Sequence, residues 1–591
     1  MCGIVGYVGK ERKALKVLIS GLEHLEYRGY DSAGIAYISD NKLIIKKESG
    51  RIIKLKETID FDNDTNIGIG HTRWATHGEP NKTNSHPHNC HDITIVHNGI
   101  IENYLELKKE LINKGYKFKS DTDTEVAAVL LYDLYKDDKD IIKAIKLFKD
   151  RAIGAYAIAI LCNQEQDTLY AIKKNSPLII GIGDNANYLA SDVPAIVEFT
   201  NKYITLDDGA YAKITKDNVI VYDNSNKQIN YQIKTFDNTY ESIDKMGYEH
   251  YMLKEINEEP IVIKRTANIK KLPDISKYKK IVITACGSAM HAGMIGKYLI
   301  EKYADIPVEV EISSEFRYKK LFINEDTLVI AISQSGETAD TLEAVKIAKQ
   351  YKSYTLGIIN VKESSIARET DEVIYIEAGR EIAVATTKAY LAQVEVLSLL
   401  AYKAANDNKL KEITTFINDL NELPIIAETI INKTEEYKLI ANKLYQKDNI
   451  FFIGRGIDYA LCMEASLKLK EISYIHSEAY PAGELKHGTI SLIEDGTPVI
   501  GIVTDEKIAD KTISNLKEVK SRGAYVIYVT TEKLAKKGDF YDESLILPTI
   551  NPLLQPLITI IPLQLIAYYI AKEKGCDIDK PKNLAKSVTV E

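Results

Sequence analysis

The sequence predicts a multidomain protein in which an α+β domain of stacked sheets precedes two tandem α/β domains. Three observations support this fold class. The chain has 591 residues, which is too many for one hydrophobic core. Short β-type runs dominate residues 1–238, and from about residue 270 strands of buried type alternate with helical patterns. Such alternation favours parallel sheets, whereas short consecutive strands favour antiparallel ones.

The N-terminal domain, residues 1–238, contains β-type runs such as CGIVGYVG, AGIAYIS and ITIVHNG. Helical patterns occur near 11–24, near 102–115 and at 123–134. We therefore expect stacked, largely antiparallel sheets flanked by helices. A charged, polar stretch at 239–269 indicates a linker that runs into a connecting helix.

The second half of the chain repeats itself. KKIVITACGSAMHAG resembles DNIFFIGRGIDYALC about 169 residues later, and EDTLVIAISQSGETAD resembles DGTPVIGIVTDEKIAD about 170 residues later. The nearly constant offset predicts two doubly wound parallel domains at 270–410 and 441–576. A connector at 411–440 joins them, and a tail at 577–591 follows.

Composition excludes several classes of protein. The net charge of −8 argues against broad nucleic-acid binding. Six scattered cysteines without a C-x-x-C pair fit neither a disulfide scaffold nor a zinc site, and we expect no metal. The N-terminus lacks a signal-peptide core. Proline and glutamine interrupt the apolar stretch at 552–571, so we expect a buried helix there and a cytoplasmic protein.

Cys2 is the first candidate catalytic residue along the chain. If Met1 is removed, residue 2 carries both a thiol and a free α-amine, whose pKa is ordinarily about 7.7–8.0. The amine can then act as the base for its own thiol. The alternative is a cysteine at this position by chance.

Further along the first domain lie parts that an acyl-transfer site for glutamine requires. Asn98 and Gly99 can provide two N–H donors for a tetrahedral oxyanion. Arg73 can bind the α-carboxylate of the substrate and Asp123 its α-ammonium. Each residue also has a simpler explanation when taken singly. Arg73 can be a surface cation, Asn98 and Gly99 can form a turn, and Asp123 can be a helix cap.

The motifs CGIVGYVG, LEYRGYDSAG, HTRWATHG, HPH, VHNGIIEN and SDTDTEV resemble the glutaminase domain of class II amidotransferases, and more narrowly the glutamine–fructose-6-phosphate aminotransferase (isomerising) family. The resemblance implies an N-terminal nucleophile (Ntn) αββα sandwich with Cys2 as nucleophile and an oxyanion hole at Asn98 and Gly99. The glutamine-binding residues that it implies are Arg73, Thr76, His77, Asp123 and Arg28. It also implies that Trp74 gates an ammonia passage.

The run AISQSGETADT (331–341) follows a buried strand and opens a helix. Its hydroxyls and the helix N-terminus suit a phosphate, although a Ser-rich capping turn is the alternative. The matching positions of the second copy hold Val503, Thr504, Asp505 and Glu506, whose acidic groups would repel phosphate. We therefore expect the phosphate site in the first copy only. In the first copy a second strand-to-helix turn, ACGSAMHAG, offers Cys286, Gly287 and Ser288 to a sugar.

Candidates for proton transfer lie in the second copy. Glu464, Lys468 and Glu471 share one helical face, which could also be a solvent-exposed charged stripe. His487 lies in a glycine-punctuated loop, and a carboxylate with a histidine suits ketose–aldose isomerisation. Lys586, in the polar tail, offers an amine for a Schiff base.

CGSAMHA, SQSGETADT, AVATTKAY, LKLKEISYIHSEAYPAGELKHG and NLAKSVTVE resemble the isomerase half of the same family, built from two sugar-isomerase (SIS) domains. By this resemblance the phosphate ligands are Ser333, Gln334, Ser335 and Thr338, and the sugar contacts are Cys286, Gly287, Ser288 and Val384. The catalytic set comprises Glu471 as base, Lys468 beside it, His487 from a neighbouring subunit for ring opening, and Lys586. This chain has Cys-Gly-Ser-Ala where the family commonly has Cys-Gly-Thr-Ser, so Ala289 is not counted as a ligand.

The resemblance implies transfer of the amide nitrogen of L-glutamine to D-fructose 6-phosphate, through channelled ammonia, in at least a homodimer and without a cofactor. Three alternatives remain: a class II amidotransferase with another acceptor, a deglycase or deaminating isomerase, and a non-catalytic sugar-phosphate sensor. The first would need a nucleotide or pyrophosphate loop after residue 238, the second would lack the Cys2 domain, and the third could dispense with Glu471, His487 and Lys586.

Overall fold

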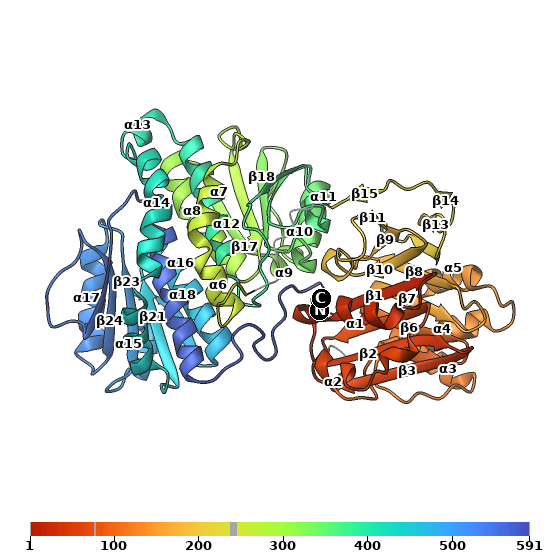
Figure 1. Cartoon of the computed structure of the whole chain (residues 1–591). Coiled ribbons are helices and arrows are strands. Elements are labelled where there is room, and N and C mark those ends of the chain that lie inside the picture. Colours follow the sequence, from red (N-terminus) through yellow and green to blue (C-terminus); the bar gives the residue numbers. More distant parts are fainter. Residues whose placement is uncertain (1, 76–77, 237–244, 590–591) are drawn as a thin grey trace. The chain divides into compact units, whose positions relative to one another are not determined.

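The computed structural model describes residues 2–75, 78–236 and 245–589 (Figure 1). The chain divides into two compact units, residues 1–240 with 587–591 and residues 241–586. The predicted fold class is confirmed: antiparallel sheets form the first unit and parallel sheets with intervening helices form the second.

The first unit contains two stacked antiparallel sheets. One has the order β15-β11-β9-β10-β1-β4-β2-β3, and the other has the order β14-β13-β12-β8-β7-β6-β5. The strands of the first are Lys234–Thr235, Lys202–Thr205, Ile179–Gly183, Ala186–Ala190, Gly3–Gly9, Ile67–Arg73, Ser32–Ser39 and Lys42–Ser49. Those of the second are Gln228–Ile229, Val219–Tyr222, Tyr211–Thr215, Thr168–Lys174, Gly154–Cys162, Ile93–Ile101 and His88–Cys90.

Helices cover the outer faces of this sandwich. The helix α1 (Ala14–Leu25) packs on the first sheet, and α3 (Tyr104–Asn113), α4 (Asp123–Tyr135) and α5 (Ile141–Arg151) pack on the second. Side chains of β1 alternate accordingly: Ile4 and Val8 lie between the sheets, whereas Val5 and Tyr7 lie under α1. Because both faces of β1 are buried, its sequence is a continuous apolar run. The layers are those of an αββα sandwich.

The second unit contains two five-stranded parallel sheets with matching strand orders, β17-β16-β18-β19-β20 and β22-β21-β23-β24-β25. The strands of the first are Val308–Ile312, Lys280–Ala285, Thr327–Ser333, Tyr354–Ile359 and Glu372–Tyr375. Those of the second are His476–Pro481, Asn449–Gly454, Pro498–Val503, Tyr525–Thr531 and Glu543–Leu547. The shared order confirms the tandem repeat. In each sheet the order reverses beside the first strand in sequence, so the turns after β16 and β18 are neighbours at the carboxyl edge of their sheet.

A layer of helices lies between the two parallel sheets (Figure 1). It includes α8 (Ser288–Ala304), α12 (Lys388–Ala404), α16 (Ile457–Ser473) and α18 (Gln555–Glu573), with α6 (Tyr251–Asn257), α7 (Glu259–Ala267), α14 (Phe416–Ile431) and α15 (Thr434–Leu444) beside them. On the outer faces lie α10 (Ala339–Gln350) and α17 (Ala509–Lys520). Residues 555–571 are all buried, as predicted for the apolar stretch. Within the described residues, no helix combines the length and hydropathy that a membrane crossing requires.

Candidate active sites

Cys2 lies immediately before β1, in the first unit. Because Gly3 pairs with Thr72 of β4, the thiol is next to the residues that follow β4. The backbone N–H of Trp74 donates to Sγ of Cys2 at 3.3 Å, and Nδ2 of Asn98 donates to the Cys2 carbonyl at 2.9 Å. Burial raises the pKa of the Cys2 thiol. The thiol therefore needs a base before it can act as a nucleophile near neutral pH.

Asn98 and Gly99 belong to β6. Nε2 of His71 lies 3.1 Å from Oδ1 of Asn98 and 3.0 Å from the carbonyl of His97. Both oxygens are acceptors, so Nε2 carries the hydrogen. Burial lowers the pKa of His71 to about 3, which keeps the ring neutral. At Gly99 φ is +117°, and a Cβ would lie 2.0 Å from the carbonyl oxygen of Ala155, so only glycine fits.

Arg73 and Asp123 lie in the same region as the thiol. The guanidinium of Arg73 donates to the carbonyls of Gly78 at 3.1 Å and Glu79 at 3.3 Å. Burial lowers its pKa, while the charges of Cys2 and Asp123 act in the opposite direction. Oδ2 of Asp123 accepts from the N–H of Ile101 at 2.8 Å. A buried cation and carboxylate around one thiol suit the zwitterionic end of an amino acid.

The other residues predicted for the glutamine site are distributed as follows. Arg28 is buried, forms an ion pair with Asp192 and donates from Nε to the Tyr27 hydroxyl at 3.2 Å. Burial acts to lower the pKa of Arg28, but the carboxylate of Asp192 outweighs it and raises the pKa. The Trp74 ring stands edge-on to Tyr30, with centroids 5.9 Å apart. Thr76 and His77 lie outside the described residues.

In the second unit, the serine-rich turn after β18 gathers hydroxyls at a helix N-terminus. Oγ of Ser333 accepts from the N–H of Gly336 at 3.0 Å and lies 3.1 Å from Oγ1 of Thr338. Thr338 is the N-cap residue of α10. Gly336 has φ of +63°, and a Cβ there would lie 1.9 Å from Oγ of Ser364. The close packing around Gly336 shapes a turn suited to an anion. Gln334 and Ser335 lie at the same turn, partly exposed.

The corresponding turn of the second copy is occupied by the chain's own carboxylate. Asp458, in the first turn of α16, accepts from the N–H groups of Thr504 at 2.8 Å and Asp505 at 3.4 Å, and from the Thr504 hydroxyl. The first copy has Ala289 at the position equivalent to Asp458. Burial raises the pKa of Asp458 to about 6. The aspartate thus takes the place that an anion would need, in addition to the repulsion expected from Asp505.

The predicted sugar turn lies between β16 and α8. Gly287 has φ of +56°, and Sγ of Cys286 lies 3.9 Å from Oγ1 of Thr341. Oγ of Ser288 donates to Oε1 of Glu464 at 2.8 Å. Val384 is buried, and its N–H donates to the carbonyl of Asp579 at 3.0 Å, which anchors the C-terminal tail beside it.

Glu464, Lys468 and Glu471 do not form an exposed stripe. The side chains of Glu464 and Lys468 are 0% and 1% exposed, so the solvated alternative is wrong. Nζ of Lys468 lies 2.6 Å from Oε2 of Glu471 and 3.5 Å from Oε1 of Glu464. Burial acts to lower the pKa of Lys468, but the two carboxylates outweigh it and raise the pKa. Lys468 is thus held as an ammonium between two acids.

The Lys586 side chain is 3% exposed and forms an ion pair with Glu381, with Oγ1 of Thr386 at 3.2 Å from Nζ. The same Glu381 accepts from the N–H groups of Thr387 at 3.0 Å and Ala389 at 3.1 Å at the start of α12. Burial acts to raise the pKa of Glu381, but the Lys586 ammonium outweighs it and lowers the pKa. His487, in contrast, is exposed on the short helical turn Leu485–His487.

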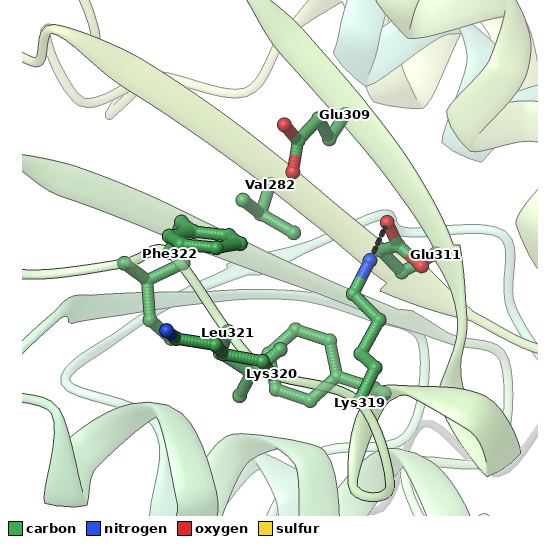
Figure 2. Close-up of a pocket in the computed structure, with 9 residues that line it drawn as sticks. Val282, Glu309, Glu311, Lys319, Lys320, Leu321 and Phe322 are labelled. Atoms are coloured by element: carbon green, nitrogen blue, oxygen red, sulfur yellow. Dashed lines mark hydrogen bonds and ion pairs between the residues drawn. The ribbon is translucent and has the colours of Figure 1, made fainter.

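A hollow of about 330 Å³ lies elsewhere, at the edge strand β17 (Figure 2). Val282, Leu321 and Phe322 line it, and an ion pair between Lys319 and Glu311 borders it. None of the predicted site residues lines this hollow.

The side chains that contact predicted site residues and that sequence reasoning missed include His71, Glu381 and His291, whose Nδ1 lies 2.7 Å from Oε2 of Glu464. His71 begins the HTRWATHG motif and His291 lies within CGSAMHA, so both motifs contained the signal. Glu381 lies two positions before the AVATTKAY motif, and no pattern there pointed to Lys586.

Comparisons with known proteins agree with this arrangement. A model of the SIS domain matches residues 274–403 and 443–573, and a model of a glutamine amidotransferase domain matches residues 71–198. The chain is 49% identical to a glutamine–fructose-6-phosphate aminotransferase (isomerising) of Caldanaerobacter subterraneus and 48% identical to one of Clostridium tetani, over 100% of both chains in each case. A structure of the C-terminal domain of glucosamine-fructose-6-phosphate aminotransferase from Francisella tularensis superimposes with a TM-score of 0.55 at 39% identity, covering 57% of this chain and 100% of that one. The chain belongs to the glutamine–fructose-6-phosphate aminotransferase (isomerising) family.

Proposed function

We propose that this enzyme transfers the amide nitrogen of L-glutamine to D-fructose 6-phosphate and isomerises the product, giving D-glucosamine 6-phosphate and L-glutamate, the first step of amino-sugar synthesis. The full-length relatives bear the name of this activity. The observation that carries the proposal is that one chain contains both Cys2 beside Asn98 and, in its second unit, the hydroxyl-rich turn after β18 and the Lys586 side chain, which is 3% exposed.

In the first half-reaction the Cys2 thiolate attacks the amide carbon of glutamine. The thiol proton passes to the α-amine that Met1 removal would free, which meets the need for a base in a buried site. Asn98 Nδ2 and the Gly99 N–H stabilise the oxyanion, and ammonia leaves as a glutamyl thioester forms. Water then hydrolyses the thioester to glutamate. Arg73 and Asp123, with Thr76, His77 and Arg28, hold the amino-acid end of the substrate.

In the second half-reaction the phosphate of fructose 6-phosphate binds at Ser333, Gln334, Ser335 and Thr338. Cys286, Gly287, Ser288 and Val384 contact the sugar. His487 assists ring opening, and Lys586 condenses with the C2 carbonyl to a Schiff base with loss of water. Ammonia displaces the lysine at C2. Glu471, with Lys468 beside it, moves a proton from C1 to C2 and so converts the ketose imine into the aldose amine.

We further propose that ammonia travels inside the protein past Trp74 and that the enzyme is a cytoplasmic homodimer or higher homo-oligomer. The exposure of His487 supports a role for this residue across a subunit interface. All six cysteines are free, which is typical of a reducing compartment.

The test supplies glutamine and fructose 6-phosphate to the full-length protein and measures glutamate and glucosamine 6-phosphate separately. Glutamate without the amino sugar would contradict the synthase function and leave the glutaminase intact. Cys2→Ala should abolish glutamine hydrolysis and keep ketose–aldose isomerisation, and residual hydrolysis would exclude Cys2 as nucleophile. Mass spectrometry of the intact protein shows whether Met1 is absent.

A further inference from the structure

A chain of polar contacts joins the predicted sugar turn of the first SIS copy to the acid/base helix of the second. Glu464 of α16 accepts from Oγ of Ser288 at 2.8 Å, lies 2.7 Å from Nδ1 of His291, and is 3.5 Å from Nζ of Lys468. Lys468 in turn pairs with Glu471 at 2.6 Å. The Glu464 side chain is fully buried and that of His291 is 7% exposed.

His291 and Glu464 are the members of this chain of contacts that neither half-reaction uses. A carboxylate only accepts hydrogen bonds, so Nδ1 of His291 carries a hydrogen and donates it to Oε2 of Glu464. Ser288 and Lys468 both contact the other oxygen, Oε1. The imidazole therefore fixes the rotation of the carboxylate about its Cγ–Cδ bond, and with it the position of Oε1.

The internal repeat shows that helix packing does not demand this arrangement. The equivalents of Glu464 and His291 in the other copy are Ile295 and Ala460, and both are fully buried. The two helices are related by the repeat and pack in the same layer. Burying a carboxylate where the sister helix has isoleucine costs free energy, so the pair contributes something other than packing.

Two consequences for the chemistry follow from the position of Oε1. The Ser288 hydroxyl donates its hydrogen bond to Glu464, so toward a sugar it can only accept one. The Lys468 ammonium is held between Glu464 and Glu471, so its position depends on where Oε1 lies. A rotated Glu464 would disturb the sugar turn and the base together.

We propose that His291 is a positioning residue for the isomerisation: it orients Glu464, which sets the Ser288 hydroxyl and, through Lys468, the carboxylate of Glu471. The inference rests on the proposed function, because it assigns Glu471 the proton transfer between C1 and C2. His291 itself does not touch the sugar.

The test compares His291→Ala and His291→Asn in the full-length enzyme, since the Asn amide N–H can take the place of Nδ1–H. We expect His291→Ala to lower kcat for glucosamine 6-phosphate formation by about 10- to 100-fold, with a smaller change in KM for fructose 6-phosphate. Glutamine hydrolysis should be unchanged, and His291→Asn should recover most of the loss. Ile295→Val is the matched control, because it alters the core face of the same helix without removing a hydrogen bond, and its kcat should equal that of the wild type.

An unchanged kcat in folded His291→Ala, or a His291→Asn variant no better than alanine, would overturn the proposal. A crystal structure of the full-length His291→Ala variant gives a second readout: we expect the Ser288–Glu464 contact to be lost, and its retention would also overturn the proposal. A wild-type enzyme that makes no amino sugar contradicts the proposed function instead, and the crystallographic readout then decides the positioning role by itself.

Discussion

Nε2 of His71 donates a hydrogen bond to Oδ1 of Asn98 at 3.1 Å. This contact fixes which end of the Asn98 amide faces the nucleophile: with Oδ1 engaged by His71, Nδ2 is left to point toward Cys2, where it donates to the carbonyl at 2.9 Å. An oxyanion hole needs a donor of fixed orientation, because a donor that must reorient during the reaction stabilises the transition state less. His71 therefore prepares Asn98 for the role assigned to it.

His71→Leu should lower kcat for glutamine hydrolysis by about 10-fold or more, somewhat less than the loss of an oxyanion donor itself. His71→Gln should recover activity, since its Nε2–H can replace that of the imidazole. Exposed His91→Gln serves as the control and should behave as wild type. Because the pKa of His71 is about 3, the wild-type pH profile should show no step from this residue above pH 5. If leucine and glutamine variants are equally active, the orienting role is wrong.

The two copies of the SIS repeat offer a matched pair of variants for the phosphate site. Ser335→Ala should raise KM for fructose 6-phosphate by about 10-fold, because a hydroxyl donor to a dianion contributes roughly 1.5 kcal/mol. Asp505→Ala, at the equivalent position of the second copy, should leave that KM unchanged. Initial rates at saturating glutamine and varied fructose 6-phosphate give the KM of both variants. Equal effects of the two substitutions would place the phosphate elsewhere.

The sequence predicted those parts of the molecule that local patterns determine. Alternating strands and helices, the internal repeat and a buried helix within 552–571 followed from local sequence patterns, and the structure confirms them, with the helix at Gln555–Glu573. What periodicity could not show is which polar groups meet across the core. Glu381 and Lys586 are 205 residues apart, and Ser288 and Glu464 are 176 residues apart. Such partners are brought together by tertiary packing, and neither residue's neighbours in sequence reveal them.

Sequence periodicity also could not show which charged side chains are buried. A glutamate and a lysine at helical spacing usually form a solvated surface pair, and the spacing of Glu464 and Lys468 is no different. Only the packing of α16 between two sheets, with α8 against it, decides that they are inside. Likewise, Asp505 and Glu506 indicated that the second copy rejects phosphate, but the occupant of that turn is Asp458, which lies on another element.

Glu381 should be needed for the Schiff-base step. Glu381→Gln keeps an oxygen for the N–H groups of Thr387 and Ala389 but replaces the carboxylate that pairs with Lys586, so the positively charged Schiff base formed at Lys586 loses its counter-charge. We expect slower glucosamine 6-phosphate formation, by about 10-fold or more. Borohydride trapping with fructose 6-phosphate, read by peptide mass spectrometry, should label Lys586 in the wild type and label it less in the variant.

The control for this experiment is Glu377→Gln, an exposed carboxylate in the same connection between β20 and α12. The labelling of Lys586 and the rate of glucosamine 6-phosphate formation in this variant should equal those of the wild type. Unchanged labelling of Lys586 in Glu381→Gln would show that the ion pair anchors the tail and has no part in the chemistry.

Asp458 should make the second SIS domain less stable as the pH rises. Its pKa is raised to about 6 by burial, from an ordinary 3.8, so the native state favours the protonated form. The raised pKa adds to the free energy of unfolding, and this contribution is fully present below pH 4. It is lost as the pH rises through 6, and the loss is on the order of 3 kcal/mol. Asp458→Asn is neutral throughout and cannot lose it. The difference in melting temperature, variant minus wild type, should therefore rise between pH 4 and pH 7 in differential scanning calorimetry. Exposed Asp448→Asn in the same domain should show no such trend, and a constant difference for Asp458→Asn would mean that Asp458 is already ionised at pH 4.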